Sequence, residues 1–331
     1  MTEPATGWGG GLWAAADLVT PMAIRVAATL RLADHIAAGT RTPEALAEVA
    51  GADPDALARL MRHLVTAGLL TAVGEGFDLT ALGERLRDDD PEGVRAWIDL
   101  EGAVGYGDLS LVELLHTVRT GEAGYPRRYG RPYWEDLGDH PERSASFDAL
   151  MESQKTGEAP AIAAAYPWGA LGHVVDVGGG NATLLIAMLR AYDGLRGTLL
   201  DLAGPAANAR RAIADAGLGD RAEAVAGSFF DVMPAGAGGY VLSSVLHNWD
   251  DEDAARILRR CGEAAAPSGK VIVVDHFGVA GDTEGDLRML CYFRGRERGL
   301  ERLGELASTV GLSVGAVGPG GTRSIVELLP G

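Results

Sequence analysis

The stretch from residue 173 to residue 189 constrains the fold of this chain more than any other. The β-branched run at 174–177 is typical of a buried parallel strand, glycines follow at 178–180, and the apolar run at 184–189 is typical of a helix. A strand, a glycine turn and a helix together bring backbone close to a nucleotide-like ligand. Asp201 ends the next apolar run about 20 residues later, where such folds place a carboxylate on ribose hydroxyls. The second half of the chain is therefore predicted to hold a ribose-bearing cofactor.

The spacing of the glycines indicates which cofactor fits this turn. The dinucleotide fingerprint G-x-G-x-x-G would need a glycine where Thr183 stands, because its pyrophosphate approaches the backbone at the start of the helix. The pattern Asp176-x-Gly178-x-Gly180 instead suits a cofactor that meets the turn with an uncharged or zwitterionic group. S-adenosylmethionine is the obvious candidate of that kind. A tight turn without a cofactor, as in any doubly wound sheet, is the alternative.

Composition and charge limit the classes of protein to which this chain can belong. Its 331 residues, 47% of them hydrophobic, are enough for about two domains with a sizeable core. A net charge of −17 argues against nucleic acid or an anionic membrane as a partner. Cys261 and Cys291 lie far apart and lack metal-site spacing, so neither a disulfide framework nor a metal site is expected. With no signal-peptide pattern and no apolar run long enough to span a bilayer, we expect a cytoplasmic enzyme.

Residues 1–100 are predicted to form a helical, winged-helix dimerisation domain. Residues 12–38 are apolar, with Pro21 as an interruption, and fit either a core helix or a helix buried against a second subunit. Thr42 and Asp53 each precede a proline and an acid, as the N-caps of two helices do, and residues 69–79 are typical of a hairpin. The scarcity of basic side chains argues against DNA reading, so packing or dimerisation is favoured.

Residues 101–165 are predicted to be a helical linker that contributes to the substrate pocket. Residues 147–165 have the pattern of a helix that joins the two halves. Residues 121–134 before it hold an unusual density of tyrosine, tryptophan and arginine. This cluster fits ordinary loop packing, and equally the wall of a pocket for a flat, hydroxylated or anionic ligand.

Residues 166–331 are predicted to form a Rossmann-like α/β domain. Short β-branched runs alternate with helical stretches, which predicts a parallel sheet with helices on both faces. The candidate strands are residues 174–177, 198–200, 222–225, 240–245 and 271–274. Ligands of such sheets bind at the carboxyl ends of the strands, and every candidate site residue of this domain but Glu297 and Arg298 lies at or just after such an end.

His247 follows the fourth strand and precedes a helix capped by Asp250 or Asp251. A neutral imidazole, with an ordinary pKa of about 6.5, is suited to accept a phenol proton, and a phenolate attacks an electrophilic methyl group far better than a phenol does. Asp275 after the fifth strand and Glu297 are carboxylates that could orient this imidazole. A structural histidine with satisfied hydrogen bonds is the alternative.

Several longer motifs together carry a resemblance to a known family. They are residues 17–30, 128–136, 146–150, 176–180, 202–205, 248–249 and 286–290. On these motifs the chain resembles the class I S-adenosylmethionine-dependent O-methyltransferases, and more closely the bacterial group that includes carminomycin 4-O-methyltransferase and aclacinomycin 10-hydroxylase. The resemblance implies S-adenosylmethionine as cofactor, an aromatic small-molecule substrate and a homodimer.

The resemblance also implies roles for single residues. The implied cofactor contacts are Asp176, Gly178, Gly180, Asp201, Ser228, Phe229 and Ser243. Asp201 matches the acid on the ribose, and Ser228 and Phe229 match the adenine pair, where the family usually has Asp in place of Ser228. His247 matches the general base of the wider family, although its nearest named relatives usually have Leu there. The predicted substrate contacts are Tyr129, Met151, Asn248 and Arg298.

The predicted reaction is methyl transfer from S-adenosylmethionine to a phenolic hydroxyl of an aromatic natural product, with an anthracycline or a similar polyketide as the leading candidate. The segment between Asp275 and Asp286 is shorter than in the nearest relatives, which bears on the substrate. Two alternatives stay open. One is a hydroxylase or decarboxylase of an anthracycline-type substrate on the same fold, and the other is a winged-helix ligand-sensing regulator.

Overall fold

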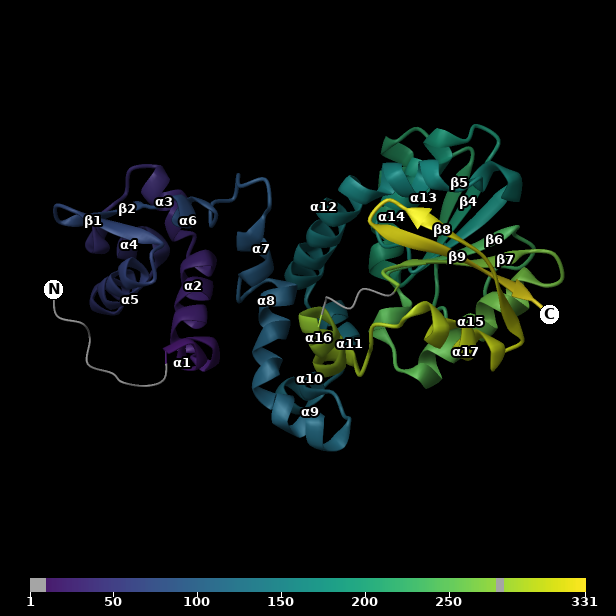
Figure 1. Cartoon of the computed structure of the whole chain (residues 1–331). Coiled ribbons are helices and arrows are strands. Elements are labelled where there is room, and N and C mark those ends of the chain that lie inside the picture. Colours follow the sequence, from purple (N-terminus) through teal and green to yellow (C-terminus); the bar gives the residue numbers. More distant parts are fainter. Residues whose placement is uncertain (1–9, 278–282) are drawn as a thin grey trace. The chain divides into compact units, whose positions relative to one another are not determined.

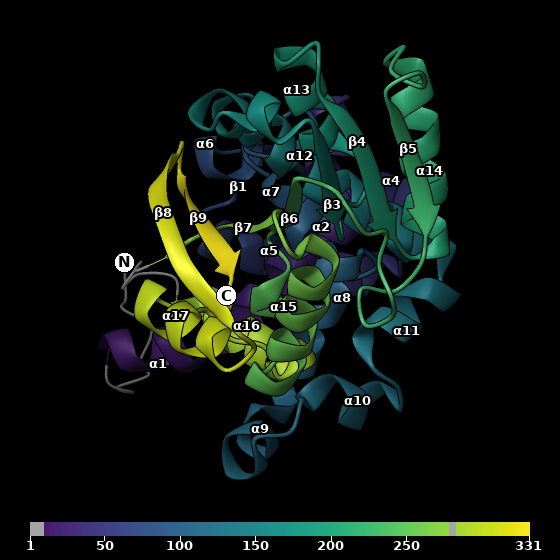
Figure 2. The ribbon, with the colours of Figure 1, turned by 90° about the vertical axis from the view of Figure 1, so that its right-hand side faces the viewer.

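One sheet of seven strands organises the second half of the chain, in the order β5-β4-β3-β6-β7-β9-β8 (Figure 1 and Figure 2). The five strands from β5 to β7 are parallel, as the alternating pattern predicts. Their bounds are β3 His173–Val177, β4 Arg196–Asp201, β5 Ala222–Ala226, β6 Gly239–Ser243 and β7 Lys270–Asp275. The chain reverses its direction of travel through the sheet between β3 and β6, and open α/β sheets bind their ligands at such a switch point.

The computed structural model describes residues 10–277 and 283–331. The chain divides into two compact units, Met1–Leu109 and Ser110–Gly331. Residues 110–165 thus belong to the same unit as the sheet.

Helices cover both faces of the sheet (Figure 1). One face packs against α12, α13 and α14, and the other against α15 and α17. The bounds are α12 Pro141–Ala165, α13 Thr183–Ala191, α14 Ala203–Asp215, α15 Asp251–Ala265 and α17 Leu300–Ser308. Alternate residues of each strand enter the two cores: Val175 and Val177 lie in one, Val174 in the other. Burial on both faces is why the strands are continuous apolar runs.

The last two strands were not anticipated from the sequence. β8 Leu312–Gly320 and β9 Arg323–Pro330 pair antiparallel with each other, and β9 pairs antiparallel with β7 (Figure 2). β8 contains three glycines and Pro319 and is mostly solvent-facing, so it lacks an apolar strand signal. β9 carries Arg323 and Glu327 among its buried positions. The predicted parallel sheet is correct as far as β7 and incomplete beyond it.

The first unit is helical with one small hairpin. Its elements are α1 Gly10–Ala16, α2 Val19–Thr29, α3 Leu32–Ala37, α4 Pro43–Ala50, α5 Pro54–Thr66, β1 Leu70–Val73, β2 Gly76–Leu79, α6 Ala81–Glu84, α7 Val94–Ile98 and α8 Ala103–Asp108. Thr42 and Asp53 are the N-caps of α4 and α5, as predicted: their side chains accept bonds from the amides of Ala45 and Ala56. β1 and β2 form the predicted wing hairpin.

Pro21 does not interrupt the N-terminal helix, contrary to the sequence interpretation. It lies in the first turn of α2, where an amide has no acceptor within the helix and a proline therefore costs little. The chain is broken instead after Ala16 and after Thr29, which gives three short helices.

Two short helices, α10 Gly124–Tyr129 and α11 Tyr133–Asp139, occupy the segment 121–134, for which loop packing was one expectation. η1 Leu109–Glu113 and α9 Leu114–Thr120 precede them, and α16 Thr283–Phe293 packs on α9 and α10. Aromatic rings from these helices and α12 contact one another: Tyr125, Tyr129, Tyr133, Trp134, Phe147, Tyr292 and Phe293. We call this set the aromatic cluster.

Candidate active site

The glycine turn after β3 is held against the end of β4. Gly178 and Gly180 have φ of 71° and 66°, which side chains other than glycine rarely adopt. The amide of Gly180 donates to Oδ2 of Asp201 at 2.9 Å, and the amide of Leu202 donates to Oδ1 at 2.7 Å. Both carboxylate oxygens of Asp201 are therefore fixed in place, and each keeps a lone pair that could accept a further hydrogen bond.

Asp176 lies at the centre of the sheet directly before this turn. It is 1% exposed, and its Oδ2 has no hydrogen-bond partner among the described residues. Burial raises the pKa of this carboxyl to about 6, with nearby Lys155 opposing the shift. A buried carboxylate without a donor fits a cationic ligand beside the turn, and S-adenosylmethionine carries positive charge on its sulfonium and its ammonium group.

The end of β6 and the loop after β5 complete this side of the site. A Cβ added to Gly178 would lie 3.0 Å from Cγ2 of Val245 and 3.5 Å from Cε1 of Phe229. The ring of Phe229 also packs edge-on against Trp249 at 5.7 Å between centroids. Ser228 precedes Phe229, and its hydroxyl accepts a hydrogen bond from the Phe230 amide. Ser243 is buried at the end of β6. The predicted cofactor residues are thus at neighbouring strand ends.

Substitution at Gly180 should separate backbone strain from blockage of the turn. A Cβ at Gly180 meets nothing within 4 Å, so Gly180→Ala should lower the free energy of unfolding by only about 1–2 kcal/mol, through its positive φ. We expect it to weaken S-adenosylhomocysteine binding as well, because the methyl group enters the open space over the turn. Urea unfolding and calorimetry measure the two effects. Gly172→Ala is the control, with φ of 66°, equally open space and a position outside the turn; unchanged cofactor affinity in Gly180→Ala would contradict the placement.

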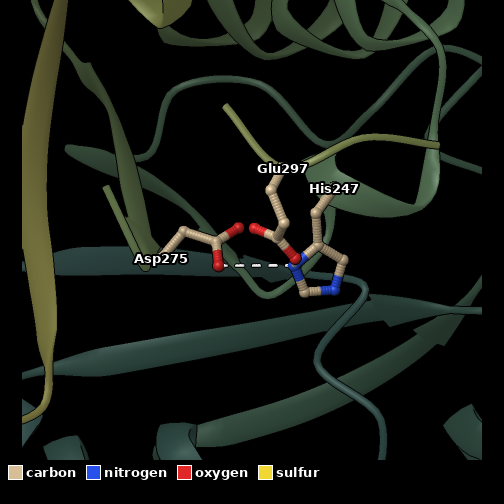
Figure 3. A group of neighbouring side chains, drawn as sticks. All are labelled: His247, Asp275 and Glu297. Atoms are coloured by element: carbon tan, nitrogen blue, oxygen red, sulfur yellow. Dashed lines mark ion pairs between the residues drawn. The ribbon is translucent and has the colours of Figure 1, made fainter. Parts of the chain in front are cut away.

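His247 lies between two carboxylates (Figure 3). Its Nδ1 is 3.4 Å from Oδ1 of Asp275 and 3.6 Å from Oε1 of Glu297, while its Nε2 points away from both. The three side chains come from η3 Leu246–Asn248, the end of β7 and the segment after α16. Burial alone would lower the pKa of His247, but Asp275 and Glu297 outweigh it, so the pKa is raised above its ordinary value. The sequence prediction that these residues come together agrees with the structure.

Asp275 is itself held by groups that the sequence did not single out. Its Oδ1 accepts the His276 amide at 3.0 Å and lies 3.7 Å from Nη1 of Arg323, on β9. Burial would raise the pKa of Asp275, but His247 and Arg323 outweigh it and hold the pKa below its usual value. Arg323 also donates to Ser244 at 2.5 Å and to Glu158 at 2.7 Å. An arginine two positions before the apolar pair Ile325-Val326 was the signal that could have found it.

His247, Asp275 and Glu297 also form a group that could hold a metal ion. Their ligand atoms all lie within 4.8 Å of one another. A His–carboxylate pair of this kind equally orients an imidazole through its Nδ1 proton. Treatment with a chelator distinguishes metal binding from orientation of the imidazole. The sequence predicts that no metal is used.

The predicted substrate contacts have unequal surroundings. Tyr129 belongs to the aromatic cluster, with its ring 4.5 Å from that of Tyr125, and Met151 is half-buried on α12. Asn248 is next to His247 in η3, and its side-chain amide donates to the Ser244 carbonyl at 3.4 Å. The aromatic side chains of 121–134 pack on one another, as the packing interpretation expects, and their role as the wall of a substrate pocket stays a prediction.

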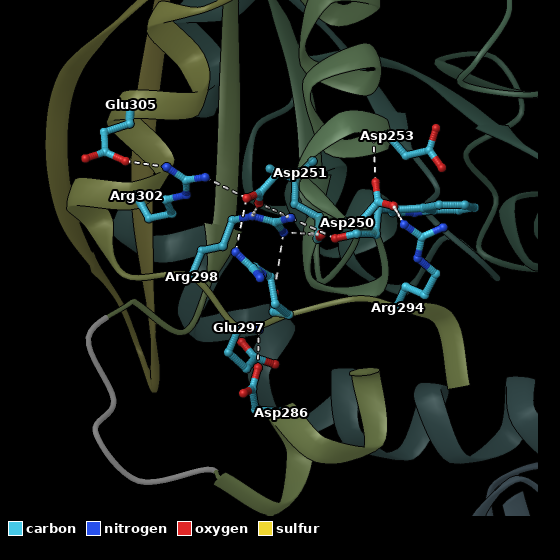
Figure 4. Close-up of polar contacts among 12 residues, drawn as sticks. Asp250, Asp251, Asp253, Asp286, Arg294, Glu297, Arg298, Arg302 and Glu305 are labelled. Atoms are coloured by element: carbon cyan, nitrogen blue, oxygen red, sulfur yellow. Dashed lines mark hydrogen bonds and ion pairs between the residues drawn. The ribbon is translucent and has the colours of Figure 1, made fainter. Parts of the chain in front are cut away.

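Arg298 is placed differently from the prediction of a substrate contact. Its side chain is 4% exposed, and all three of its nitrogens donate to protein acceptors: Asp251 and the carbonyls of Leu246 and Trp249 (Figure 4). An arginine whose donors are used in this way has little left for a ligand.

A parallel sheet with a glycine turn after β3, a carboxylate at the end of β4 and a half-buried histidine after β6 has the arrangement of a Rossmann-like methyltransferase. Comparison with known proteins gives the family. Residues 13–89 match the O-methyltransferase dimerisation domain and residues 111–313 the O-methyltransferase domain. The chain belongs to this family of S-adenosylmethionine-dependent O-methyltransferases.

Several relatives are similar over nearly their whole length. The chain is 58% identical to 2,7-dihydroxy-5-methyl-1-naphthoate 7-O-methyltransferase of Streptomyces carzinostaticus, covering 96% of this chain and 97% of that one. It is 46% identical to aclacinomycin 10-hydroxylase of Streptomyces purpurascens, covering 93% and 85%. A solved structure of the O-methyltransferase NcsB1 from neocarzinostatin biosynthesis, with S-adenosylmethionine and 2-hydroxy-5-methyl naphthoic acid, matches with TM-score 0.94 and 57% identity over 97% and 99% of the chains.

In the described part of the chain, no helix is both long enough and apolar enough to cross a membrane.

Proposed function

We propose that this enzyme methylates a phenolic hydroxyl of a small aromatic natural product of the naphthoate type. The observation that carries the proposal is His247 with two carboxylates at its Nδ1 and its Nε2 turned away from them. The similarity to a naphthoate 7-O-methyltransferase supports a two-ring substrate over a larger anthracycline.

Different residues of this chain bind the cofactor and transfer the proton. S-adenosylmethionine, when bound, supplies the electrophilic methyl group. Asp201 and the glycine turn hold its ribose and amino-acid ends, and Asp176 gives the charge that favours a cation there. His247 accepts the phenol proton at Nε2, while Asp275 and Glu297 stabilise the imidazolium that forms.

Assembly and location follow from other features. We propose a homodimer through the first unit, since Leu12, Trp13 and Leu18 expose large apolar surface in the single chain. Light scattering that gives a monomer would contradict this. The two free, buried cysteines and the acidic charge support a reduced cytoplasmic enzyme with no nucleic-acid partner.

The test of the reaction is mass spectrometry of products from a panel of hydroxynaphthoates, anthracyclines and simple phenols. We expect one added methyl group on a hydroxynaphthoate, dependent on S-adenosylmethionine. A product with a new hydroxyl, or one lacking a carboxyl, and no methyl would establish the hydroxylase or decarboxylase alternative. Binding of duplex DNA in a gel-shift assay would favour a regulator.

The pH dependence of kcat/KM should report the His247 charge. Since the imidazole accepts a proton only when neutral, the rate should rise with pH through the raised pKa of His247, with a midpoint above the ordinary value of about 6.5. Asp275→Asn removes the largest charge that raises this pKa, so the midpoint should move to lower pH. The exposed Glu305→Gln is the control and should leave the midpoint in place. If the midpoint does not move in Asp275→Asn, Asp275 does not act on the charge of His247. Loss of activity on treatment with a chelator would indicate that the three side chains hold a metal ion.

A further inference from the structure

The side chain of Arg298 binds the turn 246–249, which carries His247, and Asp251 after it (Figure 4). Nη1 donates to the Leu246 carbonyl at 2.7 Å, and Nη2 donates to the Trp249 carbonyl at 2.7 Å. Nε and Nη2 both donate to Oδ1 of Asp251, at 3.0 and 2.9 Å. One guanidinium therefore binds the backbone on both sides of His247 and is anchored to the first turn of α15.

The chain around Arg298 is also pressed against His247. A Cβ added to Gly295 would lie 2.2 Å from the His247 carbonyl oxygen, so only glycine fits there. Glu297, next to Arg298, places its carboxylate 3.6 Å from Nδ1 of His247, and its amide donates to Asp286 at 2.8 Å. The segment 295–298 thus touches His247 through both its backbone and its side chain.

We propose that Arg298 is a positioning residue for His247: with Asp251 as anchor, it fixes the turn that carries the imidazole relative to Glu297 and does not bind the substrate. The inference rests on the proposed function, in which His247 is the base. In this proposal Asp251, an acid at the start of α15 that no motif predicted for the site, holds Arg298 in place.

The planar fork of arginine explains why this position needs that side chain. Three nitrogens meet three acceptors in different directions, which a lysine ammonium at the end of a flexible chain cannot reproduce at once. Asp251 uses its other oxygen, Oδ2, for the exposed Arg296 at 3.1 Å and Arg302 at 2.7 Å. Burial would raise the pKa of Asp251, but the bonds from Arg302 and Arg298 outweigh it, so Asp251 stays ionised at neutral pH.

The first experiment compares Arg298→Lys with Arg259→Lys, the same change at an exposed arginine of α15, in the full-length enzyme, using a phenol from the panel that is methylated. Arg298→Lys should lower kcat by roughly 10- to 100-fold with KM little changed, because a small misplacement of a catalytic group costs that much. Arg259→Lys should stay within a few-fold of wild type, because Arg259 is exposed and takes no part in the bonds that hold the turn. A rise in KM at unchanged kcat would overturn the proposal in favour of a substrate contact.

A double-mutant cycle with His247→Ala separates positioning from a general structural role. In the His247→Ala background, Arg298→Lys should cause almost no further loss of rate, since the residue that it positions is absent. Equal losses in both backgrounds would overturn the proposal. If Arg298→Lys does not fold, Gly295→Ala takes its place in the cycle, because its methyl displaces the same turn without changing charge.

The outcomes distinguish this inference from the proposed function. A His247→Ala enzyme within a few-fold of wild type overturns the base role and the positioning role together. A large loss in His247→Ala with near-normal rates in Arg298→Lys and Gly295→Ala overturns only the positioning role.

Discussion

Replacing His247 by Ala is expected to lower the methylation rate by roughly 10²-fold or more at pH 7. The imidazole lies between Asp275 and Glu297 and, in the proposed function, is the group that accepts the phenol proton. Without it, the phenol must lose its proton to water. The loss should shrink as pH approaches the pKa of the phenol itself, because hydroxide then makes the phenolate without help.

Two controls make this result specific. Cofactor affinity should stay nearly unchanged in His247→Ala, measured by calorimetry with S-adenosylhomocysteine, since the bonds of Asp201 and the glycine turn do not involve His247. His276→Ala removes another half-buried histidine and keeps the backbone amide that binds Asp275, so it should be close to wild type. If His247→Ala keeps its rate at pH 7 while Tyr129→Phe loses activity, positioning of the substrate, and not base catalysis, drives the reaction.

Replacing Asp201 by Ala is expected to weaken S-adenosylhomocysteine binding by about 1.5–3 kcal/mol, roughly 10- to 100-fold in Kd. The carboxylate supplies charge-assisted hydrogen bonds to the ribose, and it also holds the Gly180 amide at 2.9 Å. Its loss therefore removes a ligand contact and loosens the turn.

Calorimetry of Asp201→Ala beside Asp215→Ala measures this effect. Asp215 is an exposed acid at the end of α14 and should not affect binding. Burial raises the pKa of Asp201, with the Gly180 and Leu202 amides opposing the shift, so wild-type affinity should also fall as pH drops through that raised pKa. Equal affinities of Asp201→Ala and wild type would remove Asp201 from the cofactor site.

The local sequence was sufficient for the elements that bind the cofactor. Strand β3, its glycine turn and helix α13 form from contiguous residues, because β-branched runs, positive-φ glycines and apolar helix faces each act over a few positions. The caps Thr42 and Asp53 follow from the same short-range chemistry. Sequence alone also placed His247 at a strand end, and with it the edge at which the site lies.

Only the tertiary structure decided how the catalytic histidine is held. Glu297, Arg298 and Arg323 are far from His247 along the chain, and the packing of β9 and of segment 295–298 brings them to it. No sequence periodicity predicts such a contact, because an ion pair between distant segments depends on which segments the tertiary structure packs together. The family resemblance implied a substrate contact for Arg298, whereas its burial and its three satisfied nitrogens show a side chain bound to its own protein.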